Sequence, residues 1–154
     1  MEKLTPEEQE EVQLKPGQVV SFDIAKKEIN AWLDGKRVSD SKREKEHIAD
    51  AIETLIDAIS YGDATIDPEK MTITQALRFP ILNEDSKPVL SSLTFKPRLR
   101  TNELKDRTAS VKQGDGIGRI CAIAGALTGQ ATAIIEKMDT EDMAIVNAVA
   151  VFFL

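Results

Sequence analysis

The sequence predicts an α+β protein that is mostly α, with an N-terminal helical hairpin, a central antiparallel β-hairpin and a C-terminal bundle of about four short helices. The β-hairpin follows from one pattern: apolar and polar residues alternate over residues 71–82 and again over 89–96, and the polar turn 83–88 separates the two runs. A period of two is typical of strands that bury one face. The helices follow from a second pattern, because apolar residues before and after the hairpin recur at helical spacing.

The first 70 residues form an acidic region in which two helices are predicted. Residues 1–20 are expected to be a loose arm, with a short strand over Gln18–Ser21. The first helix is predicted over Asp23–Asp34, with Asp23 as its N-cap and Gly35 as a left-handed stop. Its apolar stripe consists of Ala25, Ile29, Trp32 and Leu33.

The second helix is predicted from Lys42 to Tyr61. Ser41 and Glu44 have the spacing of a capping box, and Gly62 is expected to end the helix. The linker between the two helices is short, which predicts that they pack as an antiparallel pair. The apolar residues at helical spacing are Ile48, Ala51, Ile52, Leu55, Ile56 and Ile59.

We place a soft domain boundary at the end of a connector over residues 63–70, in which Ile66 is the one buried anchor. Pro68 disfavours a continuous helix there. The β-hairpin then opens the second region, residues 71–154. The residues predicted to face inward in its two strands are Ile73, Leu77, Phe79, Ile81, Val89, Leu93 and Phe95.

Four short helices are predicted after the hairpin. The first begins at Thr101 or Asn102 and continues to about Gln113. The second covers Ile117–Thr128 and is apolar on nearly all sides, which predicts burial on nearly all sides. A short apolar stripe over residues 131–138 forms the third.

The last helix is predicted to start at Asp139, with Asp142 in a first turn that favours acidic groups. The chain then ends on the apolar residues 148–154, which are either buried in the core or exposed to a partner. We expect Phe153 to be buried, and Phe152 and Leu154 to be more open.

The overall charge disfavours two classes of function. The formal net charge is −6 and the sequence pI is near 4.9, whereas nucleic acids and anionic membranes attract basic proteins. The acidity lies in residues 1–70, which carry 17 acidic and 10 basic side chains. The opening residues Met1–Glu8 are acidic and unlike a signal peptide, and no apolar run has transmembrane length. A cytoplasmic protein without membrane contact is therefore expected.

No residue cluster in the sequence predicts catalysis, a metal site or a cofactor site, so an enzyme is not expected. His47 is the only histidine and lies among charged residues, where exposure to solvent is the ordinary outcome. Cys121 is the only cysteine and lies in an apolar run, which predicts a buried core residue. The glycines of residues 114–118 lack the spacing and the preceding strand of a dinucleotide-binding loop, and a helix–helix joint is expected instead.

A basic segment suggests binding rather than catalysis. Residues 96–119 carry a local charge of +4, which suits an acidic partner segment or the acidic N-terminal half of this chain. A small nucleic-acid-binding regulator is an alternative, but Phe95 is the one aromatic residue available to stack on bases. The exposed edge of the β-hairpin is a second place where a partner strand could add.

Several short motifs follow one another along the chain from Leu77 onward. They are the strand end Leu77–Ile81, the segment Leu93–Pro97, the pair Glu103-Leu104, the turn Ala126–Gly129, the step from Ile134 to Asp142, and the closing Phe153-Leu154. In this order they resemble the Mu-type tail assembly chaperone family of tailed bacteriophages. The resemblance covers about half of the chain. Lys96 and Glu103 stand where the family usually has Arg and Asp, and Arg98–Arg100 resembles extra length before the helix.

The resemblance implies a non-enzymatic protein that binds the phage tape measure protein, keeps it soluble in the host cytoplasm and helps to recruit tail tube protein. It implies absence from the finished virion, leaves a homo-oligomer open, and does not extend to the first 70 residues. A structural adaptor retained in the virion is the alternative. The residues predicted to contact a partner are Leu93, Phe95, Lys96, Arg98, Arg100, Phe152, Phe153 and Leu154.

Overall fold

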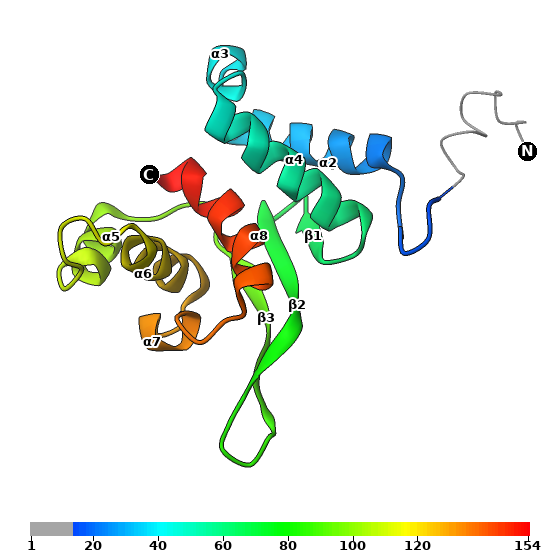
Figure 1. Ribbon diagram of the computed structural model, residues 1–154. Helices are drawn as coiled ribbons and strands as arrows, with labels where there is room; N and C mark the ends of the chain where they lie inside the picture. The colour runs from blue at the N-terminus through cyan, green and yellow to red at the C-terminus, as the bar shows by residue number, and fades with distance from the viewer. Residues whose placement is uncertain (1–13) are drawn as a thin grey trace, which may run out of the picture.

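A three-stranded antiparallel sheet, in the order β1-β2-β3, organises the fold, and helices pack around one end of it (Figure 1). The computed structural model describes residues 14–154. The N-terminal elements are α2 (Phe22–Gly35), α3 (Asp40–Arg43) and α4 (Glu46–Ser60), and the strands are β1 (Ala64–Asp67), β2 (Thr72–Leu82) and β3 (Pro88–Phe95). The C-terminal elements are α5 (Thr101–Thr108), α6 (Gly116–Thr128), α7 (Thr132–Ile135), α8 (Thr140–Ala150) and the 3₁₀ turn η1 (Val151–Phe153). The predicted α+β class, mostly α, is confirmed.

The helix α2 confirms the first predicted helix but begins and ends by other means. Its predicted apolar stripe is buried throughout. Ser21, and not Asp23, is the N-cap, because its hydroxyl accepts the N–H of Ile24. Gly35 is not a left-handed stop; the left-handed residue is Arg37, with φ 58°. A Cβ at Gly35 would collide with the side chain of Met71, so close approach explains this glycine.

The predicted second helix is divided into α3 and α4. Ser39 caps the short α3, whereas Lys45, the N-cap of α4, makes no side-chain capping bond. The expected capping box at Ser41 and Glu44 is therefore wrong. Gly62, with φ 80°, follows α4 as predicted. The helices α2 and α4 pack against each other and run in opposite directions (Figure 1).

The segment before α2 forms no strand over residues 18–21, which corrects the prediction there. The N–H of Val19 donates instead to the Ser60 carbonyl oxygen at 2.7 Å, so the chain is fastened to the end of α4. The rest of the predicted arm, residues 1–13, lies outside the described residues.

The connector after α4 contains a strand that the sequence pattern did not predict. β1 pairs antiparallel with β2 from Ala64 opposite Gln75 to Asp67 opposite Thr72. Ala64 is the buried residue of β1, and Ile66 is half-buried. Because β1 belongs to residues 1–70 and β2 to residues 71–154, the sheet joins the two regions that the sequence suggested; their status as separate domains stays a prediction.

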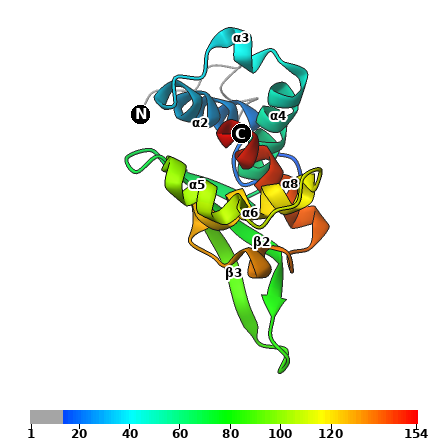
Figure 2. The same ribbon diagram turned by 90° about the vertical axis from the view of Figure 1, so that its left-hand side faces the viewer.

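The strands β2 and β3 confirm the predicted hairpin, and their turn projects away from the helices (Figures 1 and 2). The predicted inward positions Phe79 and Val89 are wrong, because these side chains are 49% and 53% exposed. The register shifts between Ala76 and Ile81, where Pro80 has no N–H to give to a ladder, so strict alternation fails there. The buried faces consist of Ile73, Gln75, Leu77 and Ile81 in β2 and of Leu93 and Phe95 in β3.

The C-terminal helices pack beside β3 and above the hairpin, with α5 next to α6 (Figure 2). α5 is shorter than predicted and ends at Thr108. α6 confirms its prediction, because an unbroken run from Cys121 to Leu127 is buried. The forecast for the last turn was reversed: Phe152 is buried and Phe153 is only partly buried.

One hydrophobic core connects both halves of the chain. It includes Trp32 and Leu55 from the N-terminal helices, Phe95 from the sheet, and Ile123 and Val149 from the C-terminal helices. Within residues 14–154, no helix is long and apolar enough to cross a membrane.

Candidate partner-binding site

Lys36, at the end of α2, is the point where three distant segments of the chain meet. Its ammonium Nζ donates a hydrogen bond to the Pro97 carbonyl oxygen at 3.0 Å. The same Nζ lies 4.0 Å from the centroid of the Phe153 ring and 5.2 Å from that of Trp32. Lys36 therefore ties the N-terminal helices to the exit of β3 and to the C-terminal turn.

A basic cleft of about 610 Å³ opens beside Lys36. Among the described residues, its lining includes four cationic side chains and no acidic one: Lys36, Arg37, Lys70 and Arg98, together with Gly35, Met71 and Pro97. None of the four forms an ion pair with another described residue. Desolvation lowers the pKa of Lys36, and the positive charges of Lys42 and Arg98 lower it further. The fold thus gathers positive charge here without neutralising it.

The structure brings together part of the predicted partner-contact set. Arg98 lines the basic cleft, Phe153 is half-buried beneath Lys36, and Leu154 is 63% exposed. Arg100 is exposed at the start of α5. Lys96 is also exposed, and its ammonium lies 3.3 Å from a carboxylate oxygen of Glu103.

Three predicted contact residues have no surface to offer in this fold. Leu93 and Phe95 are each 1% exposed, because both point to the buried face of β3. Phe152 is 9% exposed and packs edge-to-face against Trp32, with 5.4 Å between the ring centroids. These residues support the site from within the core and are corrected accordingly.

An apolar pocket of about 310 Å³ adjoins the basic cleft, and Met71 lines both. Its apolar lining is Ala31, Trp32, Ile66, Pro68 and Met71, and the charged residues Lys27 and Glu28 line it as well. The indole Nε1 of Trp32 donates to the Met71 carbonyl oxygen at 3.3 Å. That bond holds the start of β2 against α2.

Sequence reasoning missed Lys36, Lys70, Met71 and the pocket beside Trp32. Lys36 and Phe153 lie far apart in the chain, so no local motif signals their contact. One signal was available in part: the predicted cationic segment 96–119 contains Arg98, which the fold places beside Lys36 and Arg37, just after α2, and Lys70, just before β2.

A buried polar cluster joins the sheet to α8 through hydrogen bonds. The carboxylate of Asp142, 1% exposed, accepts the backbone N–H groups of Arg78 and Phe79, each at 3.0 Å. The Nε2 of Gln75 donates to the Asp142 carbonyl oxygen at 2.9 Å, while its buried Oε1 has no partner among the described residues. Ala64, the first residue of β1, pairs with Gln75, so no described strand pairs with this edge of β2 beyond Gln75, and the Asp142 carboxylate accepts N–H groups there instead. Its place in the first turn of α8 was predicted, but this role was not.

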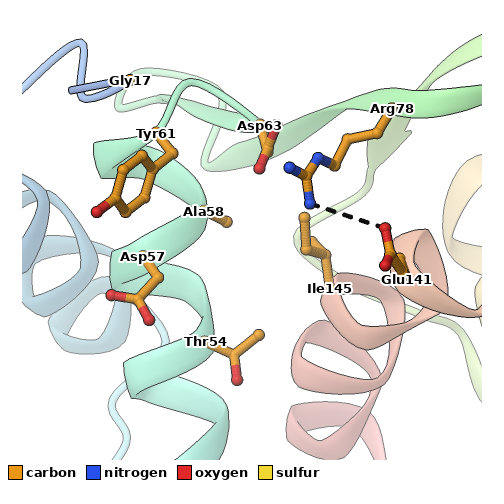
Figure 3. Close-up of a pocket in the computed structure, with 9 residues that line it drawn as sticks. All are labelled: Gly17, Thr54, Asp57, Ala58, Tyr61, Asp63, Arg78, Glu141 and Ile145. Carbon is orange, nitrogen blue, oxygen red and sulfur yellow. Dashed lines mark ion pairs between the residues drawn. The ribbon is translucent and has the colours of Figure 1, made fainter.

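A separate hollow of about 510 Å³ lies between α4, β2 and α8, and Figure 3 shows residues that line it. Arg78 extends toward Glu141, and the guanidinium and carboxylate are 3.9 Å apart. Asp57 and Asp63 line the same hollow. Both members of the ion pair are more than half exposed, so their attraction is weak. The described residues that line this hollow include no nucleophile paired with a base.

The structure places the only cysteine and the only histidine of the sequence as predicted. Cys121 is buried, and desolvation raises the pKa of its thiol, with smaller contributions from Glu136 and Asp115. A raised pKa disfavours the nucleophilic thiolate. His47 is exposed. Among the described residues, no three histidine, cysteine or acidic side chains are grouped so as to hold a metal ion.

No protein-family model, no curated protein and no solved structure matches this chain.

Proposed function

We propose that this chain is a phage tail assembly chaperone, a non-enzymatic protein that binds the tape measure protein and keeps it soluble in the host cytoplasm during tail assembly. The observation that carries the proposal is the order of motifs from Leu77 to Leu154. Each motif is short, and it is their sequence and spacing that resemble the family.

The roles of the motif residues in the fold support this proposal. Gly129 of the Thr-Gly turn ends α6 in the left-handed conformation, with φ 72°. Asp139 caps α8 by accepting the N–H of Glu141 at 2.8 Å. Asp142, the last residue of the motif from Ile134 to Asp142, accepts two backbone N–H groups of β2. A family pattern is expected to retain residues that build the fold in this way.

The surface supports a binding role. Arg98, Phe153 and Leu154 offer charge and apolar contact at one end of the molecule. The projecting hairpin adds the exposed apolar side chains of Phe79, Leu82 and Val89. Protein partners are held by such mixtures of apolar and charged contacts.

Co-expression with the tape measure protein tests the proposal. We expect more soluble tape measure protein with this chain than without it, and a complex that co-purifies. Unchanged solubility and separate elution would end the proposal. Mass spectrometry of purified virions separates the chaperone from an adaptor, because an adaptor would be retained at a fixed copy number and a chaperone would be absent.

A further inference from the structure

We propose that the basic cleft and the apolar pocket form one composite groove that binds an acidic-apolar segment of a partner protein. A bulky apolar side chain would enter the pocket beside Trp32, and carboxylates next to it would enter the cleft lined by Lys36, Lys70 and Arg98. The inference rests on the proposed function in one respect, that the chain binds a protein. It adds the chemistry of the segment that is bound.

Unbalanced positive charge argues for carboxylates in the cleft. Within residues 14–154, the four cationic side chains have no acidic neighbour in the lining, although the whole chain is acidic. Lys36 is held among them by its hydrogen bond to Pro97, and it is half withdrawn from water. A bound carboxylate would offset the mutual repulsion of these groups and would form charge-assisted hydrogen bonds.

The neighbouring pocket argues for an apolar side chain next to those carboxylates. Met71 lines both spaces, so one extended or helical segment can reach both. Ala31, Ile66 and Pro68 supply apolar walls. Burial of a large side chain there would remove apolar surface from water and so add affinity, before the losses that accompany association.

The backbone around the groove supports a built site. Arg37 and Met71 have φ of 58° and 56°, a left-handed conformation that costs energy outside glycine. They are two of the three such residues in the described part of the chain, and both line the basic cleft. Their strained backbones place the Arg37 and Met71 side chains at the cleft.

A protein segment fits this groove better than a nucleic acid does. The net charge of −6 opposes the approach of a long polyanion, whereas a short acidic segment meets the local cations first. Trp32, the one aromatic among the described residues that line the pocket, is 2% exposed and offers no open face on which bases could stack.

Trp32 fluorescence tests the proposal directly, because this is the only tryptophan and it lines the pocket. The full chain is titrated with a short synthetic peptide that has one phenylalanine flanked by glutamates. Two further peptides provide the comparison. One has serine in place of the phenylalanine, and the other has lysines in place of the glutamates. We expect saturable binding of the first peptide, with at least about tenfold weaker binding of the other two.

Charge reversal at exposed positions separates recognition from folding. In the double variant Lys70→Glu and Arg98→Glu, binding of the acidic peptide should fall by about tenfold or more at low salt. Lys105→Glu with Lys112→Glu is the matched control, because both lysines are exposed and lie outside the groove. The control should bind like the parent protein. Equal loss in both double variants would overturn the proposal, since it would show only a general charge effect.

Other occupants give different results. The double variant Lys70→Glu and Arg98→Glu is called the groove variant. If a single-stranded oligonucleotide bound as tightly as the peptide, and the groove variant lost that binding too, the groove would be an anion site for nucleic acid and the proposal would be replaced. A dimer that the groove variant dissociates would replace it with self-association. If the groove variant loses the peptide yet still solubilises the tape measure protein, the groove stands but serves another partner. If neither variant nor parent solubilises that protein, the proposed function fails on its own.

Discussion

At the scale of single residues, buried polar groups make hydrogen bonds between elements that the sequence pattern did not predict. Asp142 was expected at a helix start, and it also holds the edge of β2 through two backbone N–H groups. Such an edge would otherwise leave donors unpaired next to the core or open to another strand. The Asp142 carboxylate therefore fastens the first turn of α8 to β2, while Asp139 caps the helix.

Replacing Asp142 with asparagine tests this role. The amide keeps one acceptor oxygen but turns an NH₂ group toward a second N–H donor, so a charge-assisted bond is lost and a donor is buried without a partner. We expect a loss of about 2 kcal/mol in the free energy of unfolding, measured by urea denaturation. Glu141→Gln is the control, because its ion pair with Arg78 is exposed and should contribute less than about 0.5 kcal/mol. Similar losses in both variants would contradict the edge role.

Lys36 predicts a pH dependence whose sign follows from its lowered pKa. In the unfolded chain the ordinary value is 10.5, and in the folded protein it is lower. Between the two values the unfolded state binds more protons, so this group makes stability rise with pH up to about 10.5. Lys36→Met should remove that rise from urea denaturation curves taken at successive pH values. Lys26→Met, an exposed lysine of the same helix, should retain it.

Individual residues also show which features of the fold a local sequence pattern can predict and which it cannot. The stripe of α2 was predicted in full, because helical periodicity depends only on local spacing. Phe79 and Val89 were placed on the wrong face, because a register shift beside Pro80 breaks the period of two. Lys36 was missed because its partners Pro97 and Phe153 are distant in the chain.

At the scale of elements, helix ends were harder to predict than helix existence. The buried helix α6 was predicted nearly residue by residue from its apolar run. The short α3 was fused with α4, since both contain good helix formers and only the caps separate them. β1 has four residues and too few alternations to be distinguished from a loop, although it pairs fully with β2.

The glycines at the two ends of α6 give a matched test of whether Gly129 ends this helix. Gly129 has φ 72°, and an added Cβ would touch nothing, so Gly129→Ala should cost about 1 kcal/mol through backbone strain alone. Gly116 also has open space for a Cβ but lies at the first helical position without positive φ. Gly116→Ala should be neutral or slightly stabilising in thermal denaturation. Equal effects would mean that Gly129 does not serve as the stop.

At the scale of the whole molecule, the contacts of the C-terminal turn change the interpretation of that end. The sequence suggested an apolar terminus with Phe152 more open. The fold instead inserts Phe152 against Trp32 of α2, so the last turn packs on the first described helix (Figure 1). The partner surface at this end is thereby reduced to Phe153, Leu154 and the cations around Lys36.

This packing predicts cooperative unfolding across the boundary suggested near residue 70. Phe152→Ala removes a buried ring between the two halves and should cost about 3 kcal/mol in the free energy of unfolding. Leu154→Ala, at a side chain 63% exposed, should change it by less than about 0.5 kcal/mol. Trp32 fluorescence reports the N-terminal side, while far-ultraviolet circular dichroism reports all helices, so coincident urea transitions are expected in both proteins. If Phe152→Ala shifted only the fluorescence transition and left a later step in circular dichroism, residues 71–154 would be an independent unit, and the single core would not govern folding.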